Sequence, residues 1–173
     1  ARLVGSEMCI RDSFKTMQLP IYFISDIHLM LDESSDESAK RESLYRFLNF
    51  VRTTRGTLFF VGDLFDFYFE YPDVIPKSYF DFYNKAFQLK KAGVDLRFIA
   101  GNHDYWVLDF MKKKLMNHTY FDDTTFSLRG KNFLHYSRRW NFKLGLWIQN
   151  FKENNPLPFF HMVFPIITPY ACL

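Results

Sequence analysis

Three short polar motifs, each directly after an apolar run, carry the residues that could do chemistry in this chain. They are DIH at residues 26–28, GDLFD at residues 62–66 and GNHD at residues 101–104. The motifs supply carboxylates, an amide and imidazoles, and no thiolate. Oxygen and nitrogen donors of these kinds suit Mn²⁺, Fe or Zn²⁺ better than copper. The residue types alone therefore indicate a metal site.

Four residues are the expected metal ligands: Asp26, His28, Asp63 and Asn102. Asp26 and His28 are two positions apart, so in an extended chain their side chains point the same way and can hold one cation. A pair of cations about 3.5–4 Å apart needs a shared carboxylate, and Asp63 in the middle motif is expected to bridge them. Asn102 is then expected to hold the second cation. The pattern predicts a hydrolytic centre with two divalent metal ions, with Mn²⁺ as the first choice.

Three more residues are expected to work beside the metal ions. His103 is expected to protonate the leaving group or to stabilise charge on a phosphate. Asp104 is grouped with His103 as a catalytic residue. Asp104 and Asp66 are expected to orient His103 and a metal-bound group. Each residue has a plainer alternative as a turn residue, a helix cap or an ordinary polar histidine. Ligand-type residues at three separate strand ends favour the metal interpretation.

Buried strands and covering helices are needed to bring these motifs together. Short apolar runs are typical of parallel strands that are buried on both faces. They occur at residues 21–24, 58–61 and 96–100. Helical spacing of apolar residues predicts helices over residues 44–51, 79–89 and 107–115, with His118 late in the third. The order predicts an α/β fold with a mostly parallel sheet, whose carboxyl edge is where ligands bind.

Two other stretches of this part of the chain carry predictions. Residues 32–38 are acidic and serine-rich, which predicts a solvated loop. Residues 124–128 and 132–134 flank a short Gly-containing segment and predict a β-hairpin.

Composition limits the classes of function. The chain has 173 residues, about one domain, and residues 14–134 are expected to form it. Acidic and basic residues balance over this part, so there is no electrostatic case for nucleic acid. The two cysteines, Cys9 and Cys172, lie in the flanks, which argues against disulfides and thiolate-bound zinc. The longest apolar runs fall short of the roughly 20 residues of a membrane span, and the run at Ile21 is too short for a secretory signal.

The two ends differ in character from the middle. Residues 1–13 show no periodicity, and residues 6–13 resemble a translated sequencing adapter, so they are expected to be a non-native leader, with a short disordered leader as the alternative. After Leu134 the clean periodicity is lost. One permitted codon choice from His135, read one base later, encodes ITHGDG. Residues 135–173 are therefore predicted to be a frameshifted or disordered tail, against the alternative of a divergent C-terminus. The source nucleotide sequence tests this.

The three motifs resemble the signature of the calcineurin-like metallophosphoesterase family, in which D-x-H, G-D-x-x-D and G-N-H-D/E occur in this order. The resemblance covers roughly residues 18–134. It implies a sandwich of two sheets flanked by helices (α/β/β/α), here incomplete at the C-terminus. It also implies that Asp26, His28, Asp63 and Asn102 are ligands, with Asp63 bridging, and that His103 is the catalytic histidine.

Within this family, residues 62–71 resemble the branch that hydrolyses UDP-2,3-diacylglucosamine during lipid A synthesis. That resemblance implies a lipid-linked nucleotide substrate, and a cytoplasmic enzyme that contacts the inner membrane surface. The aromatic residues of 65–71 and Trp106 either line a groove for acyl chains or belong to the core. The chain departs from the family pattern after Leu134, where a histidine block and a later G-H-x-H motif are absent. We therefore expect the 173-residue chain to bind metal weakly and to be poorly active.

Two other functions stay open at this point. The chain could belong to another phosphoesterase of the same fold, acting on nucleotides, cyclic nucleotides or phosphoproteins. It could also be a non-catalytic scaffold that keeps the fold and binds partners. The presence of both Asp63 and Asn102 argues against the scaffold.

Overall fold

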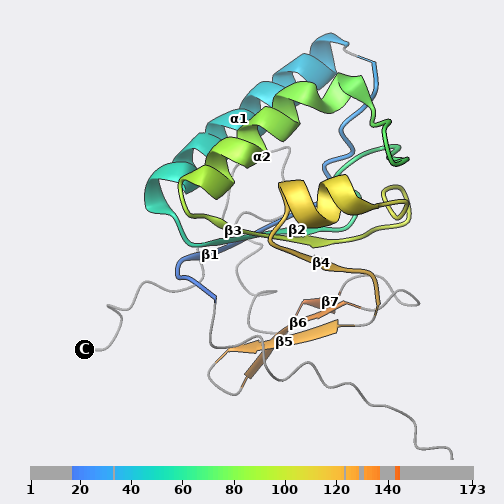
Figure 1. The fold of residues 1–173 in the computed structure, drawn as a ribbon. Helices are drawn as coiled ribbons and strands as arrows, with labels where there is room; N and C mark the ends of the chain where they lie inside the picture. The colour runs from blue at the N-terminus through green and yellow to red at the C-terminus, as the bar shows by residue number, and fades with distance from the viewer. Residues whose placement is uncertain (1–16, 33, 123, 129–130, 137–142, 145–173) are drawn as a thin grey trace, which may run out of the picture.

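A sheet of parallel strands carries the three polar motifs (Figure 1). The structure, a computed structural model, describes residues 17–32, 34–122, 124–128, 131–136 and 143–144. The sheet has the order β1-β2-β3-β4 and consists of β1 Ile21–Ser25, β2 Thr57–Val61, β3 Asp95–Ile99 and β4 His118–Tyr120. The first three strands are fully buried. The three predicted strands are thus confirmed to within one residue at each end.

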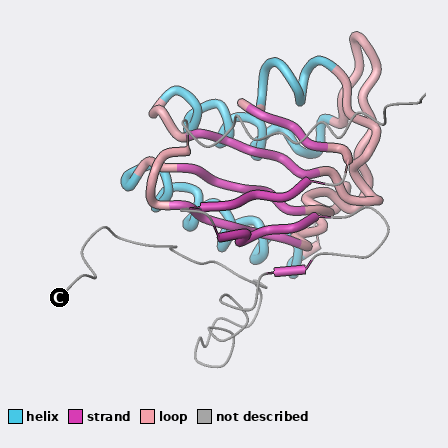
Figure 2. The backbone as a smooth tube through the Cα atoms, turned by 90° about the horizontal axis from the view of Figure 1, so that it is seen from below, coloured by secondary structure: helices cyan, strands magenta, loops and turns pink. Residues whose placement is uncertain are grey.

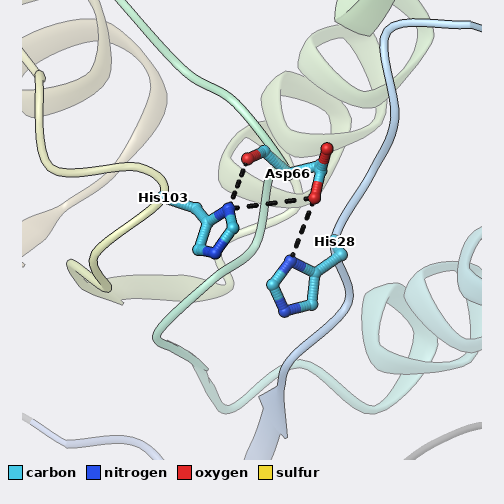
Figure 3. Close-up of side chains that lie close together, drawn as sticks. All are labelled: His28, Asp66 and His103. Carbon is cyan, nitrogen blue, oxygen red and sulfur yellow. Dashed lines mark hydrogen bonds and ion pairs between the residues drawn. The ribbon is translucent and has the colours of Figure 1, made fainter.

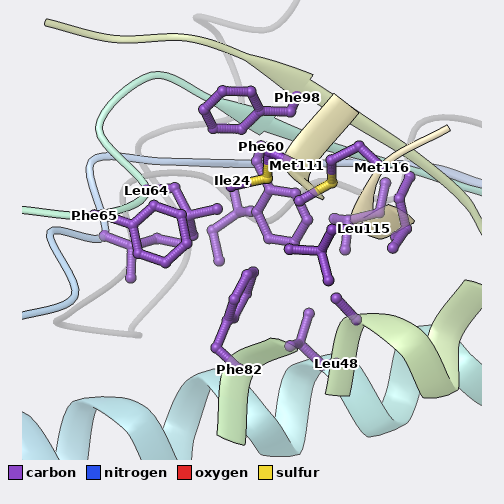
Figure 4. Close-up of a cluster of buried hydrophobic side chains, with 14 of the residues drawn as sticks. Ile24, Leu48, Phe60, Leu64, Phe65, Phe82, Phe98, Met111, Leu115 and Met116 are labelled. Atoms are coloured by element: carbon purple, nitrogen blue, oxygen red, sulfur yellow. The ribbon is translucent and has the colours of Figure 1, made fainter. Parts of the chain in front are cut away.

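The helices α1 Ser35–Thr54 and α2 Phe80–Lys91 cover one face of this sheet (Figures 1 and 2). Each connection leads to the neighbouring strand in the same direction, and right-handed crossovers then place the helices on one side. The helices bury apolar stripes against Phe60 and Phe98 of the sheet (Figure 4). These stripes are Leu44, Leu48 and Val51 of α1, and Phe82, Ala86 and Leu89 of α2. Burial of each large apolar side chain contributes about 1.5–3 kcal/mol.

A second, antiparallel sheet lies on the opposite face (Figure 1). It consists of β5 Thr124–Leu128, β6 Lys131–Tyr136 and β7 Lys143–Leu144. Phe126 of β5 packs its ring edge-to-face on Phe59 of β2, with the ring centroids 5.1 Å apart. The predicted hairpin is confirmed, and so is an α/β fold with two facing sheets. The expected second helical layer lies outside the described residues.

The predicted solvated loop at residues 32–38 is wrong from Ser35 onward, because α1 begins there. Ser34 caps the helix, and its hydroxyl oxygen accepts from the Glu37 backbone N–H at 3.2 Å. Ser-x-x-Glu is the sequence pattern of a capping box, a signal that the acidic composition obscured. Glu37 is only 2% exposed, because ion pairs with Lys40 and Arg41 compensate its charge.

The third predicted helix is shorter than expected. Only Phe110–Leu115 is helical, as a π-helical segment labelled η3, and a 3-10 turn η2 at Lys77–Tyr79 precedes α2. His118 does not end a helix but begins β4, so its predicted placement is wrong. Asn117 makes the turn into this strand: its N–H donates to Leu96 O at 2.8 Å, and its side-chain oxygen accepts from Leu96 N–H at 3.0 Å. Docking on β3 therefore overrides the helical spacing.

The predicted leader at residues 1–13 lies outside the described residues, as does most of the predicted tail at residues 135–173. Residues 135–136 and 143–144 of that tail are in strands. Within the described residues, no helix combines the length and apolar character needed to cross a membrane.

Candidate metal centre

The first three strands end level with one another, and this brings the three motifs to one edge of the sheet. Ser25 pairs with Val61, and Val61 pairs with Ile99, in the parallel register. The residues that follow leave the sheet at the same height. The geometry expected from the sequence, with polar residues at neighbouring strand ends, is present.

Three of the four predicted ligands have strained backbone. Asp26, His28 and Asp63 have φ values of 51°, 46° and 46°, in the left-handed region that residues other than glycine seldom adopt. Such conformations cost on the order of 1–3 kcal/mol each and persist where the surroundings enforce them. Backbone hydrogen bonds do so here: His28 N–H donates to Asp63 O at 2.9 Å, and Asp26 N–H donates to Gly62 O at 3.3 Å.

The loop after β3 packs in close contact with Asp63. A Cβ added to Gly101 would lie 2.1 Å from Asp63 Oδ1, so only glycine fits. His103 N–H donates to the same Oδ1 at 3.1 Å. Asn102 lies between these two residues and is exposed. The third motif is therefore in direct contact with the predicted bridging carboxylate.

Two groups of side chains in this region could each hold a metal ion. Ligand atoms of Asp26, His28 and Asp63 all lie within 4.8 Å of one another. The same holds for His28, Asp66 and His103, whose side chains converge from three loops (Figure 3). His28 belongs to both groups, which places it at the centre of the cluster. Asp66, predicted only as an orienting residue, is also placed where it could be a ligand.

One ligand atom of these groups, Nδ1 of His28, has surroundings that suit a metal ion. Nδ1 of His28 is shielded from water and makes no hydrogen bond within the described part of the chain. Asp66 Oδ1 is 3.5 Å away, which is longer than a normal hydrogen bond. Buried polar atoms normally have a partner, so an unpartnered imidazole nitrogen among carboxylates suits a cation.

The ring of His103 is oriented by Asp66. Its Nδ1 lies 2.6 Å from the backbone oxygen of Asp66, and because a carbonyl can only accept, Nδ1 carries the proton. This hydrogen bond raises the pKa of His103 above its usual value, desolvation opposes the rise, and the nearby Asp63, Asp66 and Asp104 add to it. Nε2 is then the nitrogen that is free to exchange a proton.

Asp104 was predicted to orient His103, and the structure gives its side chain other contacts. It is fully buried, and its carboxylate accepts from the backbone N–H groups of Leu64 (2.7 Å), Phe65 (3.3 Å) and Gly101 (2.7 Å). Burial raises the pKa of Asp104 to about 6, although the three donors favour the carboxylate. Asp104 thus joins the loop after β2 to the loop after β3.

Sequence reasoning missed a cluster of charged residues that holds the first motif. Lys40 Nζ donates to the backbone oxygen of His28 at 2.6 Å. Arg41 Nη2 donates to Met30 O at 2.6 Å, and Glu37 Oε1 accepts from Met30 N–H at 3.1 Å. The available signal was the Glu37–Arg41 pair at i, i+4 after a capping serine.

Comparisons with known proteins show what this chain is similar to. A family model described as calcineurin-like phosphoesterase matches residues 19–164. A UDP-2,3-diacylglucosamine hydrolase from Porphyromonas gingivalis is 37% identical over 117 residues, 68% of this chain and 45% of that protein. One from Hamiltonella defensa is 35% identical over 85 residues, 49% of this chain and 31% of that protein.

The chain therefore spans less than half the length of these two relatives. Among solved structures, a protein of unknown function from Aquifex aeolicus aligns with a TM-score of 0.36 and 20% identity, over 65% of this chain and 57% of that one.

Proposed function

Because the chain belongs to the calcineurin-like phosphoesterase family, we propose that its strand-end loops form part of a metal-dependent hydrolase that cleaves UDP-2,3-diacylglucosamine into lipid X and UMP. One observation gives the strongest support for a metal centre: ligand atoms of Asp26, His28 and Asp63 all lie within 4.8 Å of one another. The substrate is inferred from the names of the two relatives. The expected cofactor is a pair of divalent ions, Mn²⁺ before Fe or Zn²⁺.

In this proposal Asp26 and His28 would hold one ion, Asn102 would hold the other, and Asp63 would be a ligand of both. Bound there, a pair of divalent ions would supply a water molecule of lowered pKa and neutralise charge on a phosphoryl group. His103 presents Nε2 to the substrate, because its Nδ1 proton is held by the Asp66 carbonyl. Its raised pKa keeps the ring protonated to a higher pH, which suits protonation of the leaving oxygen.

Aromatic rings beside the centre support a lipid-bearing substrate. Some of these aromatic residues belong to the core and others are available to a substrate. Phe65 and Tyr68 are buried in the core, whereas Phe67, Tyr71 and Trp106 are 55%, 49% and 56% exposed. The rings of Tyr71 and Trp106 are in contact, with centroids 5.6 Å apart. Exposed aromatic surface of this kind suits apolar chains. These rings are the surface that we propose makes peripheral contact with the inner membrane; a cytoplasmic location follows only from the proposed substrate.

The proposal is tested by incubating the chain with Mn²⁺ and UDP-2,3-diacylglucosamine and measuring the release of UMP. Slow release that is abolished in Asp63→Asn, but not in the exposed control Asp73→Asn, supports it. Hydrolysis of simple phosphodiesters without UMP release would point instead to another phosphoesterase. Absence of any Mn²⁺ binding by calorimetry would overturn the metal centre and favour a scaffold.

A further inference from the structure

Glu70 is a second buried carboxylate that accepts several backbone N–H groups. It is 2% exposed. Its Oε2 accepts from Leu108 N–H at 3.0 Å and Met111 N–H at 3.2 Å, and its Oε1 accepts from Phe110 N–H at 2.5 Å. The hydroxyl of Tyr68 donates to Oε2 at 3.3 Å. One side chain therefore satisfies three backbone donors of another segment.

Two of these donors, Phe110 N–H and Met111 N–H, belong to the start of η3, where N–H groups have no partner within the helix, and Leu108 lies just before it. The residue at its N-cap position, Asp109, makes no capping hydrogen bond with its side chain. Glu70, which is 38–41 positions away in the sequence, takes over that function. An N–H group that is shielded from water and has no acceptor is destabilising, and Met111 N–H is buried, so η3 depends on this carboxylate.

The segment that contains Glu70 runs beside the segment that contains His103. At the end near the metal centre, Tyr68 N–H donates to His103 O at 3.1 Å, and His103 Nδ1 contacts Asp66 O at 2.6 Å. Further along, Phe69 and Trp106 form an isolated parallel bridge. The hydrogen bonds of Glu70 close the far end of this contact. Two segments fixed at both ends have little freedom to slide past each other.

We propose that Glu70 is a positioning residue, which keeps the Asp66 segment against the His103 segment and so fixes the His103 ring on the Asp66 carbonyl. Its relevance to catalysis rests on the proposed function. The effect of Glu70 on the His103 ring can be measured without any enzymatic turnover. The Glu70 proposal can therefore fail or hold independently of the hydrolase proposal.

The test compares Glu70→Gln with Glu42→Gln, whose side chain is 73% exposed in the wild type. Glutamine keeps the size of the side chain but replaces one acceptor oxygen with a donor. In the metal-free 173-residue chain, ¹⁵N NMR at a fixed pH above the His103 titration reports which ring nitrogen carries the proton. Amide hydrogen exchange reports the protection of Leu108, Phe110 and Met111. Glu70→Asp, which keeps both oxygens, is the second variant.

In Glu70→Gln we expect a mixture of His103 tautomers in place of the Nδ1–H form, and at least about ten-fold faster exchange of the three amides. Glu42→Gln should match the wild type in both measurements. Faster exchange with an unchanged His103 tautomer would overturn the proposal, because Glu70 would then only stabilise η3. Unfolding of both Glu70 variants would reject it as well, in favour of a general role in stability.

Discussion

The Asp63 carboxylate shows how the candidate centre is constrained at the scale of single residues. Its φ of 46° is enforced from one side by the first loop, because Asp63 O accepts from His28 N–H. From the other side, Gly101 leaves no room for a Cβ, and His103 N–H donates to Oδ1. A ligand held from two sides needs little reorganisation to bind an ion, which is the usual arrangement in metal sites.

Gly101→Ala tests this close approach. The added Cβ would lie 2.1 Å from Asp63 Oδ1 and would have to displace it. We expect a loss of about 1–3 kcal/mol in the free energy of unfolding, as for other overpacked sites, and at least about ten-fold weaker Mn²⁺ binding by calorimetry.

Gly93→Ala is the matched control for Gly101→Ala. Gly93 has a φ of 91° and open space around it, so alanine should cost only about 1–2 kcal/mol of backbone strain and leave Mn²⁺ affinity unchanged. Unaltered Mn²⁺ binding in Gly101→Ala would show that the contact between the two loops is not needed.

His118 gives a prediction about pH, at a site remote from the metal centre. Burial lowers its pKa, the nearby Arg97 lowers it further, and Asp95 opposes both. The unfolded chain therefore takes up the proton first, so stability falls as pH decreases from about 6.5 through the pKa of the folded state. The side chain is 46% exposed, which keeps this effect below about 1 kcal/mol.

Urea unfolding between pH 7 and pH 5 measures this dependence on pH. The slope of stability against pH should be shallower in His118→Gln than in the wild type. An NMR titration that places the pKa of His118 above its usual value would contradict the prediction.

At the scale of elements, α1 positions the first motif as well as covering the sheet. Its first turns carry Glu37, Lys40 and Arg41, which contact the backbone of His28 and Met30. Glu37 and Arg41 are nearly fully buried, so their charges depend on each other. The helix that supplies the core with Leu44 and Leu48 thus also fixes the loop that contains two predicted ligands.

Glu37→Ala should be strongly destabilising, because it leaves the buried Arg41 without its carboxylate. Removal of one partner of a buried pair typically costs about 3–5 kcal/mol. Glu42→Ala, which removes an exposed pair with Arg46, should cost no more than about 1 kcal/mol. Urea unfolding of both variants measures the difference. Equal, small losses would mean that the cluster does not hold the first motif.

At the scale of the whole molecule, the parallel sheet is packed between helices on one face and a second sheet on the other (Figure 1). The described loops supply Asp26, His28, Asp63 and Asn102, with Asp66 and His103 beside them. The chain spans 45% of the relative from Porphyromonas gingivalis. The histidine motifs expected later in the family pattern are absent from the sequence.

We therefore expect the 173-residue chain to bind Mn²⁺ weakly and to hydrolyse phosphoesters poorly. Calorimetry should detect weak binding, and addition of EDTA should abolish whatever hydrolysis is present. Rapid metal-dependent hydrolysis by this chain would contradict the expectation. Codons around His135 that cannot encode HGD in the shifted frame would independently eliminate the frameshift hypothesis.

The sequence alone determined where the chemistry gathers. Apolar runs that end in Asp, Asn or His are local signals, and parallel strands necessarily bring their carboxyl ends to one edge of a sheet. For this reason the three strands, two covering helices and the hairpin were predictable, and so was the proximity of Asp26, His28 and Asp63.

Only the tertiary structure decided which groups contact one another. That Asp66 orients His103 while Asp104 joins two loops depends on the directions of side chains in irregular backbone. The start of β4 at His118 depends on its pairing with Arg97 of β3, which is distant in the sequence. Local patterns carry no information about such long-range contacts, because the free energy that selects them arises only when the segments pack together.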